Sequence, residues 1–89
     1  MTVRYTPEFI NGVKNLNVRV RKSFKEKIDI FKLRPYDPQL VNHQLKREYL
    51  GYRSINITSN YRAIYKEIDE GREKVAYFVT IGTHKELYG

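Results

Sequence analysis

The first third of the chain places apolar residues three or four positions apart, the spacing of helices that bury one face. The first such stretch follows Thr6 and Pro7, which suit the N-cap and the first turn of a helix. A helix is therefore predicted from Pro7 to about Leu16, after a short alternating strand over residues 2–5. A second helix is predicted from near Asn17 to just before Pro35, on a stripe of four apolar residues: Val20, Phe24, Ile28 and Phe31. Because the two helices follow each other closely, we expect a helical hairpin.

After residue 49 the period changes to two, which is typical of strands. Residues 51–57 alternate, with Arg53, Ile55 and Ile57 on one side, and residues 60–68 alternate again. The polar residues 69–74 predict a hairpin loop. Residues 75–81 are apolar on both sides, which predicts a central strand covered on both faces, and a terminal turn follows. The order β-α-α-β-β-β predicts one α+β domain over residues 1–89, with the helical hairpin packed on a small, mostly antiparallel sheet.

Composition narrows the class of protein. A chain of 89 residues is long enough for one domain, and the absence of cysteine excludes a disulfide framework and a cysteine-based zinc site. No apolar run is long enough to span a membrane, so a cytoplasmic protein is expected. The net charge of +7 lies entirely within residues 14–53, which hold eleven basic and four acidic residues. Such a block favours a polyanionic partner, although a solubilising helix face would have the same composition.

Three stretches resemble the RelE/ParE superfamily of type II toxin–antitoxin toxins, and most of all its RelE/YafQ-type mRNA endonucleases. They are DPQLVNHQLKREYLGYRSI over residues 37–55, NYRAIYKEI over residues 60–68 and IGTHKELYG over residues 81–89. The resemblance implies a RelE-like microbial ribonuclease fold. It also implies a toxin that cuts mRNA in the ribosomal A site and that an acidic antitoxin neutralises. Operator DNA would be reached only through the antitoxin complex, and no membrane partner is implied.

RNA carries its own nucleophile, because its 2′-hydroxyl can attack the adjacent phosphorus. This reaction needs proton transfer and positive charge, so no metal and no cofactor are expected. The resemblance implies three catalytic residues. His84 would move a proton near neutral pH, Arg62 would stabilise the developing phosphorane charge, and Tyr88 would stack on a base or bind a phosphate. The alternatives are a surface histidine, an arginine in an ion pair and a tyrosine that caps the core.

A second set of side chains is expected to hold the RNA. It consists of His43, Lys46, Arg47, Arg53, Asn56 and Asn60. The chain departs from the family pattern at three positions: Asn56 stands in place of a histidine, Asn60 in place of an acidic residue and Thr80 in place of an arginine. Two other functions therefore stay open, a ParE-like poison of DNA gyrase and a catalytically degenerate toxin that only binds its antitoxin.

Overall fold

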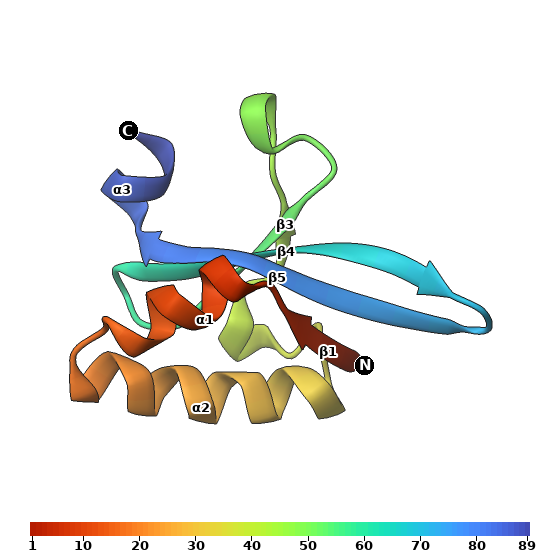
Figure 1. The fold of residues 1–89 in the computed structure, drawn as a ribbon, viewed down its shortest axis with the longest axis horizontal. Coiled ribbons are helices and arrows are strands. Elements are labelled where there is room, and N and C mark those ends of the chain that lie inside the picture. The colour runs from red at the N-terminus through yellow and green to blue at the C-terminus, as the bar shows by residue number, and fades with distance from the viewer.

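The computed structural model describes residues 1–89 and confirms the predicted α+β fold. Its five-stranded sheet has the order β1-β5-β4-β3-β2, with β1 parallel to β5 and all other neighbours antiparallel. Helices α1 and α2 cover one face of the sheet, and α3 lies on the other side (Figure 1). The elements are β1 (Thr2–Tyr5), α1 (Pro7–Lys14), α2 (Val18–Leu33), β2 (His43–Gln44), β3 (Arg53–Asn56), β4 (Tyr61–Glu70), β5 (Glu73–Thr83) and α3 (His84–Tyr88), with two 3₁₀ turns, η1 (Pro38–Leu40) and η2 (Arg47–Tyr49).

The two predicted helices begin at side-chain caps. The Phe9 N–H donates to Thr6 Oγ1 at 3.1 Å, and the Val20 N–H donates to Asn17 Oδ1 at 3.0 Å. All four residues of the predicted stripe on α2 are buried, which confirms that this face packs on the sheet. Helix α1 ends at Lys14, slightly before the predicted end.

The hydrophobic core lies between the helical hairpin and the sheet. The ring of Phe31 on α2 lies 5.0 Å from Tyr65 on β4 and 5.3 Å from Phe78 on β5, both edge to face. Phe9 on α1 lies 5.5 Å from Phe78 and from Phe24. Fully burying one such ring stabilises a fold by roughly 1.5–3 kcal/mol, so these aromatic side chains dominate the core.

The predicted hairpin is present, but its loop is shorter than the predicted residues 69–74. Strands β4 and β5 stay paired as far as Glu70 and Glu73, and only Gly71 and Arg72 form the turn. Gly71 has a φ of 63°, the left-handed conformation that a tight hairpin turn requires. The ribbon extends beyond the helices, so its side chains contact water, and polar residues there do not break the pairing (Figure 1).

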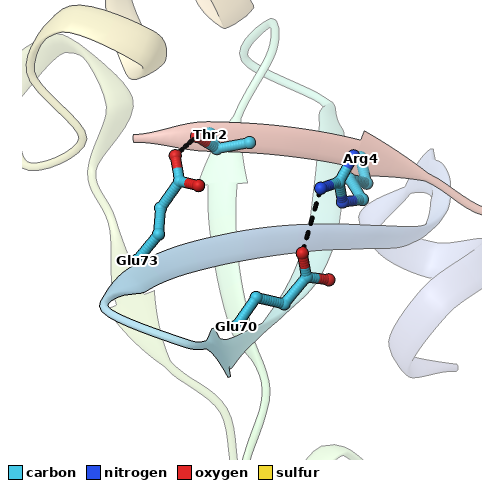
Figure 2. Close-up of polar contacts among 4 residues, drawn as sticks. All are labelled: Thr2, Arg4, Glu70 and Glu73. Atoms are coloured by element: carbon cyan, nitrogen blue, oxygen red, sulfur yellow. Dashed lines mark hydrogen bonds and ion pairs between the residues drawn. The ribbon is translucent and has the colours of Figure 1, made fainter.

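Polar contacts join the tip of this ribbon to β1. Arg4 Nη2 lies 2.9 Å from Glu70 Oε1, and the Thr2 hydroxyl donates to Glu73 (Figure 2). The carboxylate of Glu70 raises the pKa of Arg4, first through the hydrogen bond and then through its charge. The parallel strand β1 and the hairpin tip are thus joined by side chains as well as by the backbone.

A β-bulge in β5 decides which residues face away from the helices. Ile64 pairs with Thr80 and Tyr65 with Phe78, so Val79 is an extra residue without a partner. Phe78 therefore faces the helices, whereas Thr80 faces the opposite side, which we call the open face. Residues that share it by register include Asn56, Arg62 and Gly82, and also Ser54 and Ile64. None of the helices combines the length and the apolar character that a membrane span requires.

Candidate functional site

The predicted terminal turn is in fact a short helix, α3, which begins at His84. Thr83 caps it: the Glu86 N–H donates to Thr83 Oγ1 at 3.1 Å, and the Thr83 N–H donates to Glu86 Oε1 at 2.7 Å. The bonds to Thr83 lower the pKa of the Glu86 carboxyl, with the backbone bond as the largest cause. The helix packs over Gly82, where an added Cβ would lie 3.3 Å from Glu86 Oε1. These contacts fix the first residue of the helix at the end of β5.

Four aromatic rings form a row from α3 to the segment around η2. His84 and Tyr88, one helical turn apart, have ring centroids 4.7 Å apart in an edge-to-face arrangement. Tyr88 lies 5.9 Å from Tyr49, which lies 6.3 Å from Tyr52. The row connects the last six residues of the chain with a loop about forty positions earlier in the sequence.

Two hollows on either side of this row form a groove. The larger, of about 630 Å³, is lined by Lys46, Arg47, Glu48, Tyr49, Leu87 and Tyr88. The smaller, of about 270 Å³, is lined by Glu8, Glu48, Tyr49, Tyr52, Val79 and Thr80. Glu48 and Tyr49 border both hollows, so we treat the two as one groove, the tyrosine groove. Arg47 has a φ of 58°, an uncommon backbone conformation for a residue other than glycine, and such conformations cluster at functional sites.

A second cluster lies at the other end of α3, around the turn between β3 and β4. The His84 N–H donates to the Asn60 carbonyl at 3.0 Å. Arg62 Nη1 donates to the carbonyls of Thr58 at 2.9 Å and Tyr61 at 3.1 Å, which holds the guanidinium against this turn. Asn56 is the cross-strand partner of Arg62, and its buried Oδ1 accepts no hydrogen bond from the protein. An unpaired buried acceptor is costly, so the local structure must compensate for this atom elsewhere.

No protein-family model and no curated protein matches the chain. Solved structures do match over nearly its whole length. YafQ from E. coli is 23% identical with a TM-score of 0.78, and the alignment covers 98% of this chain and 97% of YafQ. A YoeB/ParE toxin from Agrobacterium tumefaciens is 21% identical with a TM-score of 0.74, covering 94% of this chain and 99% of the toxin. The RelBE2 toxin–antitoxin complex from Mycobacterium tuberculosis gives 22% identity and a TM-score of 0.64, covering 93% and 96%. The chain has the fold of the RelE/YafQ-type toxins.

On this RelE-like fold, most of the predicted site residues gather around α3. Asn56, Asn60 and Arg62 lie at its His84 end, whereas Lys46 and Arg47 line the groove at its Tyr88 end. The sequence motif GTHKELY is local, so the pairing of His84 with Tyr88 follows from helical geometry alone.

Two predicted RNA-binding residues lie elsewhere. His43 is exposed on the edge strand β2, and its Nδ1 lies 2.9 Å from the Val41 carbonyl. Strands β3 and β4 separate it from β5. Arg53 shares the helix-covered face with its partner Tyr65, and its Nε donates to Asn42 Oδ1 at 2.8 Å. Both side chains thus lie away from α3.

The sequence interpretation named neither Glu48 nor Tyr49 among the candidate site residues. Glu48 borders both hollows and takes part in no ion pair. It places a carboxylate at the groove, whereas the departure at Asn60 had removed one from the expected set. A signal was present, since Glu48 is the one acidic residue between Asp37 and Arg62, in the middle of a basic stretch.

Proposed function

We propose that the protein is the toxin of a type II toxin–antitoxin pair and an endoribonuclease that cuts mRNA on the ribosome, in the cytoplasm. The observation that carries the proposal is the tyrosine groove, which Lys46, Arg47, Glu48 and Tyr88 line and which His84 adjoins through its ring contact with Tyr88. A carboxylate, two cations and aromatic rings thus border one space, and an imidazole lies one ring away. These are the groups that metal-independent RNA cleavage requires.

The proposed reaction begins when the 2′-hydroxyl of the RNA loses its proton and attacks the neighbouring phosphorus. The bond from phosphorus to the 5′-oxygen then breaks, and that oxygen takes up a proton. The products are a 2′,3′-cyclic phosphate and a 5′-hydroxyl, so one group must accept a proton and another must donate one. His84 and Glu48 divide these two transfers between them.

The remaining residues stabilise and position the RNA. Arg62 uses Nη1 to hold two carbonyls, which leaves the N–H groups of Nη2 and Nε to stabilise the phosphorane. Lys46 and Arg47 bind phosphates, and Tyr49 and Tyr88 offer ring faces to bases.

The proposed regulatory partner is an acidic antitoxin. Solved structures with this fold include the DinJ–YafQ and RelBE2 toxin–antitoxin complexes. A net charge of +7, confined to residues 14–53, would attract an acidic chain. Operator DNA would then be contacted only through the antitoxin complex.

Primer extension on a reporter mRNA in a translating extract tests the nuclease. Wild-type protein should cut within codons, and only while translation proceeds. His84→Ala and Glu48→Gln should each slow the cleavage by about a hundredfold or more, because each removes a proton-transfer group. His43→Ala is the matched control, since this histidine is exposed and lies outside the groove.

Two results would contradict the mechanism. If both groove variants cut as fast as wild type, His84 and Glu48 do not transfer the protons. If folded wild-type protein cuts nothing, the result favours the two other functions, a gyrase poison or a toxin that only binds its antitoxin. A gyrase supercoiling assay separates these two.

A further inference from the structure

A further hollow, of about 380 Å³, lies across β2, β3 and β4 and shares only Tyr52 with the tyrosine groove. We call it the edge pocket. Its polar lining consists of Gln44, Arg53 and Glu67, one from each strand, and its apolar lining of Leu45, Leu50 and Tyr52. Its volume falls within the range of about 300–1,000 Å³ that small-molecule sites occupy, and a few polar groups among apolar ones are typical of such sites.

The sheet register places the three polar side chains of the edge pocket on one face. Gln44 is the cross-strand partner of Arg53, which is the partner of Tyr65, and Glu67 follows Tyr65 by two positions. Side chains two positions apart on a strand point to the same face, so Arg53 and Glu67 are diagonal neighbours with Cβ atoms roughly 7–8 Å apart. This spacing leaves room for a planar group between the guanidinium and the carboxylate.

One tyrosine holds both charged groups of the edge pocket in place. The Arg53 guanidinium lies 5.3 Å over the Tyr36 ring, and the Tyr36 hydroxyl donates to Glu67 Oε1 at 3.2 Å. Arg53 Nε also donates to Asn42 Oδ1 at 2.8 Å. Neither Arg53 nor Glu67 takes part in an ion pair. Two opposite charges thus border one hollow without neutralising each other, and Nη1 and Nη2 of Arg53 and Oε2 of Glu67 are free to bind a ligand.

Guanine has the edges that match this pair of charges. Its O6 and N7 are adjacent acceptors, which an arginine binds through two N–H groups. Its N1–H and 2-amino groups are adjacent donors, which the two oxygens of a carboxylate accept. Adenine fits less well, because it has an amino group in place of O6 and would set N–H donors against Arg53. A phosphate fits less well too, because the Glu67 carboxylate would repel it.

The apolar lining of the edge pocket suits the faces of the same base. Leu50 is 76% exposed, whereas Leu45 is 8% exposed and forms a fixed wall. A planar base that covers Leu50 removes apolar surface from water, which is favourable. The lining therefore matches both the polar edge and the apolar face of a purine.

We propose that the edge pocket binds a guanine base, with Arg53 on O6 and N7, Glu67 on N1–H and the 2-amino group, and Leu50 against the ring. The base has two possible sources, a free guanine nucleotide and an RNA strand. Tyr52 borders both the edge pocket and the tyrosine groove, so a strand in the groove passes one side chain to reach the pocket. Only the RNA source rests on the proposed nuclease function.

The test uses three nucleotides as probes: GMP, AMP, and IMP, which lacks the 2-amino group of guanine. Amide NMR shifts of the full chain locate the site, and their dependence on concentration gives the affinity. GMP should shift the amides of Gln44, Gly51 and Glu67 and should bind about tenfold more tightly than AMP. IMP should bind about fivefold more weakly than GMP, because it lacks one of the two donors that Glu67 accepts.

Glu67→Gln connects the ligand group with the residue. Glutamine keeps one oxygen for the Tyr36 hydroxyl but cannot accept two donors of guanine. The variant should bind GMP about tenfold more weakly, and its preference for GMP over IMP should fall below about twofold. The matched control is Glu26→Gln, the same change of charge at an exposed residue of α2, which should alter neither value by more than about twofold.

Two RNAs separate the sources of the base, one of about nine uridines and the same RNA with a single central guanosine. If only the guanosine-containing RNA shifts the amides of the edge pocket together with those of the tyrosine groove, the base comes from RNA. If GMP shifts the edge pocket and neither RNA does, the ligand is the free nucleotide. Either result supports the guanine site.

Three outcomes would overturn the proposal. One is the absence of shifts in the edge pocket with both GMP and the guanosine-containing RNA at millimolar concentration. Another is equal affinity for GMP and AMP, and the third is a Glu67→Gln variant that behaves like Glu26→Gln. Binding is measured without translation and without cleavage, so failure here is distinguishable from failure of the nuclease.

Discussion

The position of His84 and Tyr88 depends on the cap of a helix only five residues long. Helices this short are not stable by themselves, so their caps and contacts decide whether they form. Thr83→Ala removes the oxygen that accepts the Glu86 N–H at 3.1 Å and leaves the second half of the capping box in place. Replacing a threonine N-cap by alanine costs about 0.5–2 kcal/mol, typically about 1 kcal/mol. A loss of about 1 kcal/mol raises the opened fraction of α3 about fivefold.

Amide hydrogen exchange measured by NMR tests this value. The Gly89 N–H, which donates to the Lys85 carbonyl at 2.9 Å, should exchange about fivefold faster in Thr83→Ala. Amides in β4 and β5 should be unaffected, because the opening is local. Thr83→Ser keeps the accepting hydroxyl and should behave as wild type. Unchanged exchange in Thr83→Ala, or equal acceleration in Thr83→Ser, would refute the role of this cap.

Three further changes test the core and the electrostatics. Phe31→Ala, in a fully buried position, should lower the free energy of unfolding in urea by about 3–5 kcal/mol, whereas Leu33→Ala, at a residue 77% exposed, should change it by less than about 0.5 kcal/mol. Tyr65→Phe removes the hydroxyl that accepts a hydrogen bond from Asn42 Nδ2 at 2.8 Å and should cost about 1 kcal/mol in the same assay. Because the folded-state pKa of Glu86 is lowered, its stabilisation of α3 is present above the unfolded pKa and is lost as pH falls through the folded pKa. Protection of α3 amides should therefore decline in acid for wild type but not for Glu86→Gln, which keeps the acceptor and does not titrate.

The helical hairpin was predictable because the local signals in its sequence, the caps and the apolar stripes, agree with the way the helices pack on the sheet. The apolar stripe of α2 has the period of the helix and meets one face of the sheet, and Thr6 and Asn17 cap the helices through their own side chains. The length of the loop over residues 69–74 was predicted wrongly for the opposite reason. A run of polar residues marks the end of a strand only where that strand packs on a core. This ribbon extends past the helices, so polar residues continue its strands. The two-residue strand β2 has too little pattern of its own to be seen in the sequence.

In the candidate site, too, some residues could be predicted from a local motif and others could not. His84 and Tyr88 are one helical turn apart, so a short motif was enough to pair them. Glu48 and Tyr49 reach α3 only through the order of the sheet and its register, which no local pattern encodes.

The bulge at Val79 brings α3 to the same face of the sheet as the segment that carries Glu48 and Tyr49. Side chains alternate between the faces of a strand, so one extra residue exchanges the faces of everything that follows it. With Val79 inserted, Phe78 remains in the core, yet Thr80 and Gly82 face away from the helices. Gly82 then leaves room for α3 to pack against the strand on that side. The same residues paired without the bulge would turn Thr80 and Gly82 toward the helices. His84 and Tyr88 are thus paired by local sequence, whereas Glu48 and Tyr49 come from a distant segment. One unpaired residue in β5 sets the face of the sheet on which α3 lies.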